Sequence, residues 1–348
     1  MVDHDLLVPY GWTETVAARY AASLDQDCVP ARVLRMDRSE CDVITPTGPA
    51  RAKCPRADSP ISGLCTGDWV SLDGRGEVRA LLPRHTAIVR SSASGRSTGQ
   101  VLAANVDTVL ICTAADGDVD PGRIERMLAL VWESGAQPVV VLTKADAADE
   151  ISLDDVRAVA PGATVLAVSA SAAFGLDVLA AVLDGTVALL GPSGAGKSTL
   201  ANALLGREVF ATNDVRATDK KGRHTTAHRE LRPLPGGGTL IDTPGLRGVG
   251  LWHAAEGIGR TFSDIEELAP HCRFADCAHE SEPGCAVREA IGSGAITERR
   301  LTSYRKLARE NAWMQARTDK RLQADRERVW RDITKQHRRI NRERGNRR

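Results

Sequence analysis

The sequence lacks long hydrophobic runs and any recognisable targeting segment. A transmembrane helix needs about 20 consecutive apolar residues, and no stretch of this chain approaches that length. The first ten residues also lack the basic segment followed by an apolar segment that is typical of a signal peptide. We therefore expect a cytoplasmic protein. Its 348 residues are too many for one small core, which suggests two or three domains.

The chain also has few aromatic residues and almost no net charge. Phenylalanine, tyrosine and tryptophan make up only 4% of the chain, and the net charge is +1. The charge is unevenly distributed, because residues 287–348 contain 19 Lys and Arg against 8 Asp and Glu, a local +11 that leaves −10 for the rest. A basic terminal segment favours a polyanion such as a phosphate backbone as partner, and a solvated helical face is the alternative.

Cysteine is used in two ways. Five of the eight cysteines show no metal-ligand spacing, and we interpret them as packing residues: Cys28, Cys41, Cys54, Cys65 and Cys112. The other three form the pattern Cys272-x4-Cys277-x-His279-x5-Cys285. Three thiolates and one imidazole suit a closed, structural Zn²⁺ site, whereas a disulfide would leave an odd cysteine. His271 is a rival ligand, but its place beside Cys272 makes the geometry awkward.

The most informative pattern is a Gly-rich segment between an apolar run and a helical stretch. Residues 191–199 have the sequence GPSGAGKST, which contains the P-loop pattern G-x-x-x-x-G-K-S. Its glycines let successive amides surround a phosphate at the N-terminus of the following helix. Lys197 would reach the β- and γ-phosphates, and the Ser198 hydroxyl would bind Mg²⁺. The expected phosphate-binding residues are Gly191, Ser193, Gly194, Ala195, Gly196, Lys197, Ser198 and Thr199.

Three further motifs follow apolar runs, at the strand ends where open α/β sheets bind ligands. They are TKAD at residues 143–146, SA at 169–170 and DTPG at 242–245. The Asp146 carboxylate can accept hydrogen bonds from N1–H and the exocyclic amine of guanine, which adenine cannot offer. Asp242 would hold Mg²⁺ through water, and the Gly245 amide would face the γ-phosphate. The expected base-binding residues are Thr143, Lys144, Asp146, Ser169 and Ala170.

Residues 31–90 consist of short alternating runs separated by turns. This pattern predicts a small β-barrel, and its length fits an OB-type barrel of about five strands. Such a barrel could bind nucleic acid, or it could be purely structural. Because Trp69 is its only aromatic residue, we expect the barrel to recognise the backbone and shape of a nucleic acid instead of stacking on its bases. The basic residues in or beside these runs are Arg32, Arg35, Arg38, Arg51, Lys53 and Arg56.

The order of the motifs is unusual, because the base-binding motifs precede the P-loop, whereas ordinary GTPases have them last. This order is a circular permutation, and the chain resembles the RsgA-type (YjeQ) small ribosomal subunit biogenesis GTPases. The segments that carry the resemblance are TKAD, GPSGAGKST, GRHTT at 222–226, DTPG and the Cys/His cluster at 272–285. The family usually has Asn-Lys-x-Asp, so Thr143 in place of Asn predicts a softer preference for guanine.

The resemblance implies an α/β P-loop GTPase domain, circularly permuted, preceded by an all-β OB-type barrel and followed by a small α-helical zinc-binding domain. It also implies GTP and GDP, Mg²⁺ and one structural Zn²⁺ as cofactors, and the small ribosomal subunit with its rRNA as partner. We expect a monomer that leaves the subunit on hydrolysis. The expected segments are a lead-in (1–30), the barrel (31–90), a polar linker (91–100), the GTPase domain (101–250) and the zinc domain with its basic tail (251–348).

The residue that positions the attacking water is not the usual glutamine. Many GTPases place Gln directly after D-x-x-G, but this chain has Leu246 there, which cannot orient water. His224 is the nearest substitute and the resemblance points to it as well, with a non-catalytic loop histidine as the alternative. By resemblance Thr226 supplies a second Mg²⁺-binding hydroxyl, so the expected catalytic residues are His224, Lys197 and Thr226.

Two other functions fit parts of the sequence. GPSGAGKST alone would suit a phosphotransferase such as a nucleoside monophosphate kinase, but TKAD and DTPG would then have no task. An rRNA-binding scaffold that only senses GTP is the second alternative. Because the chain passes from DTPG directly towards the C-terminal domain, we also expect loss of the γ-phosphate to move that domain.

Overall fold

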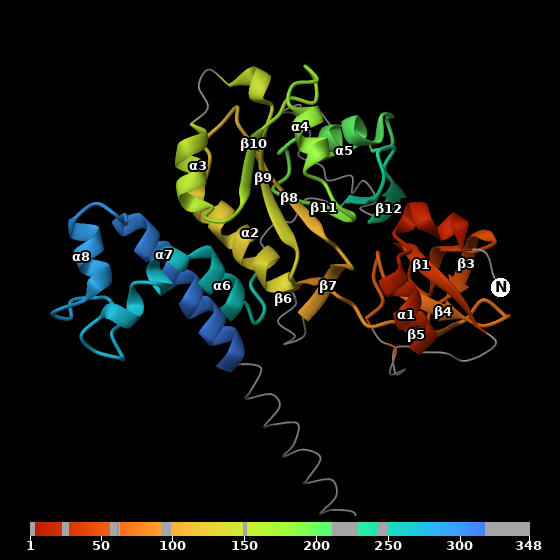
Figure 1. The fold of residues 1–348 in the computed structure, drawn as a ribbon, viewed down its shortest axis with the longest axis horizontal. Helices are drawn as coiled ribbons and strands as arrows, with labels where there is room; N and C mark the ends of the chain where they lie inside the picture. Colours follow the sequence, from red (N-terminus) through yellow and green to blue (C-terminus); the bar gives the residue numbers. More distant parts are fainter. Residues whose placement is uncertain are drawn as a thin grey trace, which may run out of the picture.

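A computed structural model of the chain describes residues 4–22, 28–55, 61, 63–91, 99–148, 152–210, 229–242 and 250–316. A β-barrel, an α/β region and a helical region follow one another along the longest axis of the molecule (Figure 1). His224, Thr226, Gly245 and most of the basic tail lie outside the described residues. Among the described helices, none combines the length and the apolar composition that a bilayer crossing requires.

The barrel has the strand pairing of an OB fold. Its strands are β1 (Val29–Met36), β2 (Glu40–Thr45), β3 (Gly48–Lys53), β4 (Trp69–Leu72) and β5 (Val78–Leu81). Strand β1 pairs antiparallel with both β2 and β4, which pair in turn with β3 and β5. A parallel bridge between Lys53 and Glu77 closes the ring. Alternating side chains such as Val33, Val43 and Val70 fill the interior, so the predicted barrel is confirmed.

Two N-terminal helical segments cover one end of the barrel. They are η1 (Asp5–Tyr10) and α1 (Glu14–Ala22), which carry the buried residues Leu7 and Val16. The ring of Trp12 meets the ring of Trp69 edge to face at 5.2 Å, and Trp69 is only 3% exposed. The one aromatic residue of the predicted barrel segment therefore packs in a core and offers no surface for stacking a base.

The central sheet is built from parallel strands with helices on both faces. Its order is β10-β9-β8-β11-β13-β12, and only β12 runs antiparallel to its neighbour. The strands are β8 (Thr108–Ala114), β9 (Gln137–Thr143), β10 (Thr164–Ala167), β11 (Thr186–Leu190), β12 (Glu230–Pro233) and β13 (Thr239–Asp242). The α/β sheet expected from the apolar runs is confirmed.

The helices of this region divide between two hydrophobic cores. One face of the sheet carries α2 (Pro121–Ser134) and α3 (Leu153–Val159). The other face carries α4 (Leu176–Ala181) and α5 (Lys197–Leu205). Helix α2 begins where the Asp120 side chain accepts a hydrogen bond from the Arg123 amide, which is the usual way to cap a helix N-terminus.

A two-stranded hairpin stands where the sequence predicted a linker. Strands β6 (Ala87–Ser91) and β7 (Gly99–Ala104) pair antiparallel, so the described ends of the expected 91–100 linker lie in strands. The hairpin buries Ile88, Leu102 and Ala103 in the α2 core. The Gly/Ser-rich composition of residues 91–100 gave no sign of the two strands, because the buried side chains of β6 and β7 lie before and after this segment.

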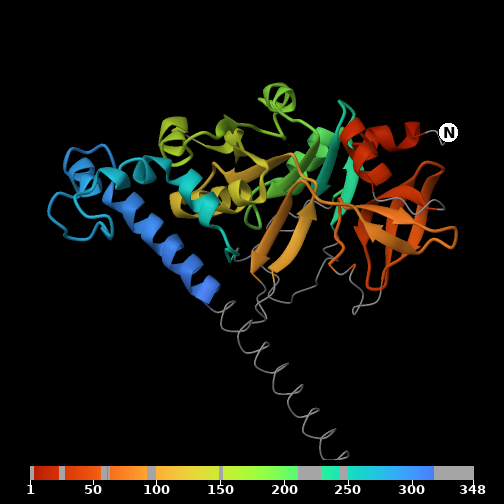
Figure 2. The same ribbon diagram turned by 60° about the horizontal axis from the view of Figure 1, so that its bottom comes forward.

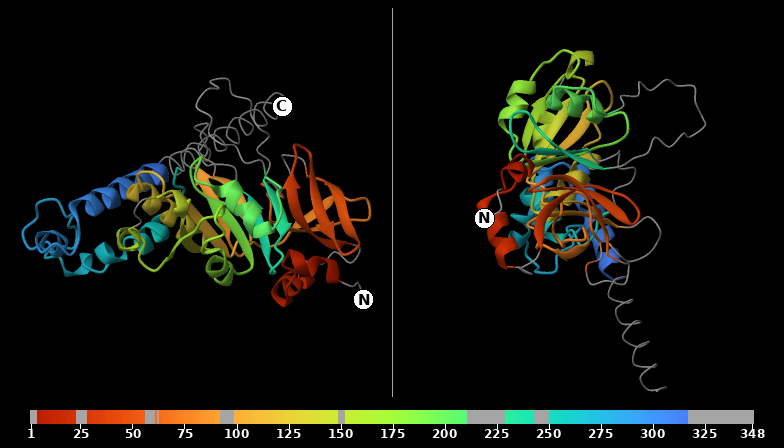
Figure 3. Two further views of the ribbon diagram at one scale, coloured as in Figure 1. Left: turned by 90° about the horizontal axis from the view of Figure 1, so that it is seen from above. Right: turned by 90° about the vertical axis from the view of Figure 1, so that its right-hand side faces the viewer.

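The C-terminal region packs on α2 as several short helices followed by one long helix. These are α6 (Ala255–Thr261), α7 (Ser263–Glu266), η3 (Ala269–His271), α8 (Ala286–Gly292) and a helix whose described residues are 298–316. The last helix, blue in Figure 2, runs beside α6, and Figure 3 shows the same arrangement from above and end on. Leu301 and Leu307 of this helix are buried.

Buried charges attach this region to the α/β region. Glu125 of α2 is fully buried and accepts hydrogen bonds from Arg299 and Arg300 at 2.9 Å. Arg300 also donates to Asp264 at 2.6 Å. Removing one member of such a buried pair would leave an uncompensated charge, so these contacts fix the C-terminal helix on α2.

Candidate nucleotide and metal sites

The P-loop joins β11 to α5 with the backbone that its glycines allow. Gly191 has a φ of 150°, and a Cβ there would lie 2.3 Å from the Cys112 carbonyl oxygen of the neighbouring strand β8. Gly194 and Gly196 have φ values of 85° and 68°, in the left-handed region that favours glycine. Strand β11 therefore approaches β8 closely and turns sharply into α5, which directs the helix N-terminus at the loop.

Lys197 occupies a buried position at the start of α5. Its side-chain Nζ donates to the Pro192 carbonyl oxygen at 2.7 Å, across the mouth of the loop. Burial lowers the pKa of Lys197, and burial raises the pKa of Asp242 at the end of β13. Both charged forms thus lack solvation, and each would gain from a bound group of the opposite charge, phosphate for Lys197 and a cation for Asp242.

The motifs predicted to bind the base and the P-loop helix meet at one small cavity. Its volume is about 60 Å³, and residues from three separate segments line it. The lining residues are Thr143, Lys144, Val168, Ala170, Ser171, Gly196, Thr199 and Leu200. Five of them belong to the set predicted to bind nucleotide, namely Thr143, Lys144, Ala170, Gly196 and Thr199. The structure therefore brings together three segments, of which the first and the last lie more than fifty residues apart in the sequence.

The predicted base-binding residues have different partners. Thr143 is 3% exposed and donates its hydroxyl to the Ala195 carbonyl oxygen at 3.0 Å, which ties β9 to the P-loop. Lys144 has a φ of 57° and pairs with Asp116 at 2.8 Å. Asp146 accepts from the Ser171 hydroxyl at 3.0 Å, and hydrogen bonds from Ser169 and Ser171 lower the pKa of Asp146. Its carboxylate is therefore ionised at neutral pH.

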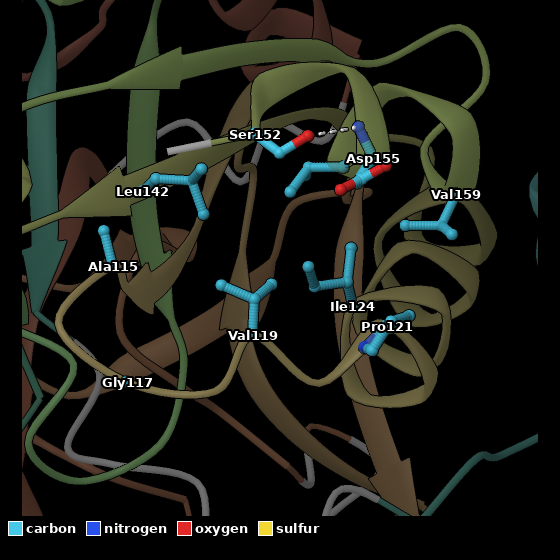
Figure 4. Close-up of a pocket in the computed structure, with 10 residues that line it drawn as sticks. Ala115, Gly117, Val119, Pro121, Ile124, Leu142, Ser152, Asp155 and Val159 are labelled. Carbon is cyan, nitrogen blue, oxygen red and sulfur yellow. Dashed lines mark hydrogen bonds between the residues drawn. The ribbon is translucent and has the colours of Figure 1, made fainter. Parts of the chain in front are cut away.

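A larger cavity of about 360 Å³ lies on the opposite face of the sheet, and the sequence analysis missed it. Figure 4 shows Ala115 and Val119 after β8, Leu142 of β9 and Val159 of α3 around it. Leu142 and Thr143 are consecutive in β9, so their side chains point to opposite faces. The walls of this larger cavity are mainly apolar and contain no Gly-rich amide loop, so we do not assign the phosphate site to it.

The predicted Cys/His cluster comes together as one group. The ligand atoms of Cys272, Cys277, His279 and Cys285 all lie within 4.8 Å of one another. The Cys272 and Cys285 sulfurs are 3.8 Å apart, and His279 Nδ1 is 3.5 and 3.4 Å from them. Zn–S bonds of about 2.3 Å in a tetrahedron place two sulfurs about 3.8 Å apart. The spacing therefore fits a tetrahedral structural metal, and His271 is not part of the group.

Two features that the sequence analysis did not single out shape the metal loop. The Glu282 carboxylate accepts hydrogen bonds from the amides of Ala278, Glu280 and Ser281, which lowers the pKa of Glu282. The Cys285 sulfur accepts from the Arg288 amide at 3.4 Å and thereby caps α8. The loop is thus ordered by backbone hydrogen bonds around the ligands, which a spacing pattern does not reveal.

Several basic residues of the barrel are not free to bind a polyanion. Arg32 is only 1% exposed and lies between the barrel and the central sheet. Arg51 is exposed but forms ion pairs of 2.7 to 2.9 Å with Asp37, Glu40 and Asp42. Arg56 lies outside the described residues. The barrel's own carboxylates thus offset much of the positive charge that the sequence suggested.

The P-loop shares a cavity with the TKAD and SA segments, which precede it in the chain, and it lies on a mainly parallel sheet. This arrangement defines a circularly permuted P-loop GTPase. The sequence model of the RsgA GTPase family matches residues 81–252. The "Small ribosomal subunit biogenesis GTPase RsgA" of Streptomyces avermitilis is 54% identical over 335 residues, which cover 93% of this chain and 90% of that protein. The chain therefore belongs to the RsgA GTPase family.

Other similar proteins agree with this assignment. The "Small ribosomal subunit biogenesis GTPase RsgA 2" of Lactiplantibacillus plantarum is 40% identical, over 88% of this chain and 90% of its own length. The crystal structure of YjeQ from Thermotoga maritima matches 82% of this chain and 99% of that chain, with a TM-score of 0.57 and 24% identity. The circularly permuted GTPase YloQ matches with a TM-score of 0.55 and 21% identity, over 82% of this chain and 96% of that chain. These two structures support the fold.

Proposed function

We propose that the protein hydrolyses GTP to GDP and phosphate while it assists late maturation of the small ribosomal subunit. The observation that carries the proposal is the shared cavity of the TKAD, SA and P-loop segments. The names of the Streptomyces and Lactiplantibacillus relatives support the choice of the small subunit. The same names support GTP hydrolysis and give no support to a phosphotransferase.

The nucleotide site would hold a guanine nucleotide with Mg²⁺. Ser198 and Asp242 stand at the start of α5 and the end of β13, and Thr226 is the third Mg²⁺ ligand proposed by resemblance. The buried Lys197 would release Pro192 and turn to the phosphates. The magnesium would neutralise charge on the phosphates, and His224 would position the attacking water. The Gly245 amide would face the γ-phosphate.

The Cys/His cluster would hold one Zn²⁺. All four donors are thiol or imidazole groups, the set that zinc prefers in closed sites, and their spacing fits a tetrahedron. With no ligand position left for water, the metal would hold α8 and the preceding loop in place without taking part in hydrolysis. Metal analysis of the purified chain tests this proposal.

The rRNA contacts would come mainly from the C-terminal region. Residues 287–348 carry a local charge of +11, from 19 basic and 8 acidic residues, whereas the barrel's Arg51 is already paired with three carboxylates. Contacts to phosphate backbone weaken steeply with salt, because bound counterions are released. We propose a monomer that binds the subunit in the cytoplasm in its GTP state, is stimulated by it and leaves on hydrolysis.

The decisive experiment measures GTP hydrolysis with and without purified small subunits, with ATP as the control nucleotide. We expect slow intrinsic turnover, faster turnover with the subunit and no comparable ATP turnover. A rate that small subunits leave unchanged would favour a scaffold that only senses GTP. Equal turnover of ATP would contradict the guanine site.

A further inference from the structure

The proposed hydrolysis of GTP makes no use of the larger cavity on the α2 and α3 side of the sheet. Its volume of about 360 Å³ lies in the range of pockets that bind small molecules. Ile124 of α2, Leu142 of β9 and Val156 of α3 line it and are otherwise buried. Figure 4 shows Val119, Ile124 and Leu142 around the same space. The cavity therefore offers an apolar surface from several elements to one apolar group.

The polar part of the cavity carries a negative charge. Ser152 and Asp155, at the start of α3, stand beside one another there (Figure 4). The Ser152 hydroxyl accepts the Asp155 amide and caps the helix, so the Asp155 carboxylate is not needed for the cap. The adjacent Asp154 pairs with Arg157 at 2.8 Å, whereas Asp155 has no ion pair in the part of the chain that the structure describes. A carboxylate beside apolar walls suits a ligand that joins an apolar body to a cation.

The loop between β8 and α2 connects this cavity with the predicted base site. Ala115 and Gly117 line the cavity on either side of Asp116. The Asp116 carboxylate accepts a hydrogen bond from Lys144 Nζ at 2.8 Å. The Ala115 amide donates to the Thr143 carbonyl oxygen at 2.8 Å. Because Thr143 and Lys144 line the smaller cavity, a ligand that holds this loop also restrains two residues of the predicted nucleotide site.

We propose that the larger cavity is an effector site for a small organic molecule with an apolar body and a protonated amine. The body would lie among Ile124, Leu142 and Val156, and the amine would pair with Asp155. A bound ligand would order residues 115–117 before the nucleotide arrives and so raise the affinity for guanine nucleotides. By linkage, a bound nucleotide would raise the affinity for the amine by the same factor. This coupling rests on the proposed nucleotide site, whereas the binding of the amine does not.

The test uses the full chain and three probes with one apolar body, namely 4-phenylbutylamine, 4-phenylbutanol and 4-phenylbutyrate. Ligand-observed NMR titrations measure their binding, and titration of a fluorescent GDP with and without the amine measures the coupling. Asp155→Asn removes the charge that would pair with the amine. Asp154→Asn is the matched control, because the Asp154 side chain is 92% exposed and does not line the cavity. Val156→Phe fills the cavity.

We expect the amine to bind with a Kd of about 1 mM, as its small size allows. It should bind about threefold more tightly than the alcohol, and the acid should bind more weakly than the alcohol. Asp155→Asn should remove the preference for the amine, Asp154→Asn should keep it, and Val156→Phe should abolish binding of all three probes.

We expect near-saturating amine to raise the affinity for GDP by about fivefold. Hydrogen exchange at residues 115–119 should slow in the presence of the amine. Asp116→Asn breaks the ion pair with Lys144, so it should remove the coupling and leave the affinity for the amine unchanged.

Several outcomes overturn the inference. Absence of amine binding, or equal binding of the amine and the acid, would show that the cavity does not select a cation. An equal loss in Asp154→Asn and Asp155→Asn would reduce the selection to the general charge of this surface. An unchanged affinity for GDP with the amine bound would refute the effector role.

If Val156→Phe fails to fold, the probe series and the two aspartate variants still decide the question. Absence of GTP turnover in the original chain would instead refute the proposed function and leave the binding of the amine intact, so the two failures are distinguishable.

Discussion

Thr143 donates its hydroxyl hydrogen bond to the Ala195 carbonyl oxygen at 3.0 Å, so its single hydroxyl proton is already used. A Cβ on Gly196 would lie 3.2 Å from the same hydroxyl. The threonine that replaces the usual asparagine thus holds the P-loop against β9. At the scale of single residues, we therefore expect discrimination of the base to depend on Asp146.

We predict that Asp146→Asn weakens GTP binding by about a hundredfold or more, because the amide is uncharged, can accept only one of the two guanine hydrogen bonds and turns its own donor towards the other guanine donor. The same variant should gain affinity for xanthosine triphosphate, since an amide can donate to the carbonyl that replaces the exocyclic amine of guanine. Asp177→Asn, at an exposed position on α4, is the matched control. Competition binding measures the affinities of the original chain and both variants for GTP, XTP and ATP. An unchanged preference for GTP in Asp146→Asn would exclude Asp146 from the base site.

At the scale of elements, helices α2 and α6 cross in close contact. A Cβ on Gly257 of α6 would lie 1.9 Å from the Ala129 carbonyl oxygen of α2, so only glycine fits there. The Gly257 amide also donates to the Glu133 carboxylate at 2.9 Å. Two residues further along the same helix, Gly259 has open space where its Cβ would be.

This pair of glycines gives an internal control. Gly257→Ala should destabilise the protein by about 1–3 kcal/mol, because α6 must move away from α2. Gly259→Ala should be neutral or stabilise by up to about 1 kcal/mol, because alanine restricts the unfolded chain and favours a helix. Denaturant unfolding of both variants measures the difference. Similar stability in the two would contradict the close approach of the helices.

Across the whole molecule, Arg32 connects three regions. Its guanidinium donates to the Thr186 hydroxyl of β11 at 2.7 Å and to the Tyr10 carbonyl oxygen, and it lies 5.2 Å from the centre of the Trp69 ring. Burial lowers the pKa of Arg32 to about 10, opposed by Asp107 and Asp68, so the group stays charged at neutral pH. The barrel is thus joined to the sheet by a buried charge as well as by the single β1–β12 bridge between Arg35 and Glu230.

Replacing Arg32 should destabilise the protein. We expect Arg32→Leu to lower the free energy of unfolding by about 3 kcal/mol or more, because several buried acceptors lose their donor. Arg38→Leu, at an exposed position of the same barrel, should change it by less than about 0.5 kcal/mol. Chemical denaturation followed by tryptophan fluorescence measures both. Equal stability of the two variants would show that Arg32 does not hold the barrel on the sheet.

The sequence by itself determined the features that are encoded over short distances. Helix α2 is bounded by such local signals, because Pro121 suits a first helical turn and Gly135 suits the left-handed turn that ends it. The P-loop and the metal ligands were also predictable, because their chemistry requires fixed spacings.

The tertiary structure decided the contacts between distant segments. No local sequence pattern indicated these contacts. They include the hydrogen bond of Thr143 to Ala195, the burial of Arg32, the β6–β7 hairpin and the hydrogen bonds of Glu310 and Asn311 to the amides of Leu251 and Ala254. The physical reason is that a side chain's partner across tens of residues is set by how the sheet and helices pack. Spacing along the chain carries information only for groups that fold onto their own neighbours.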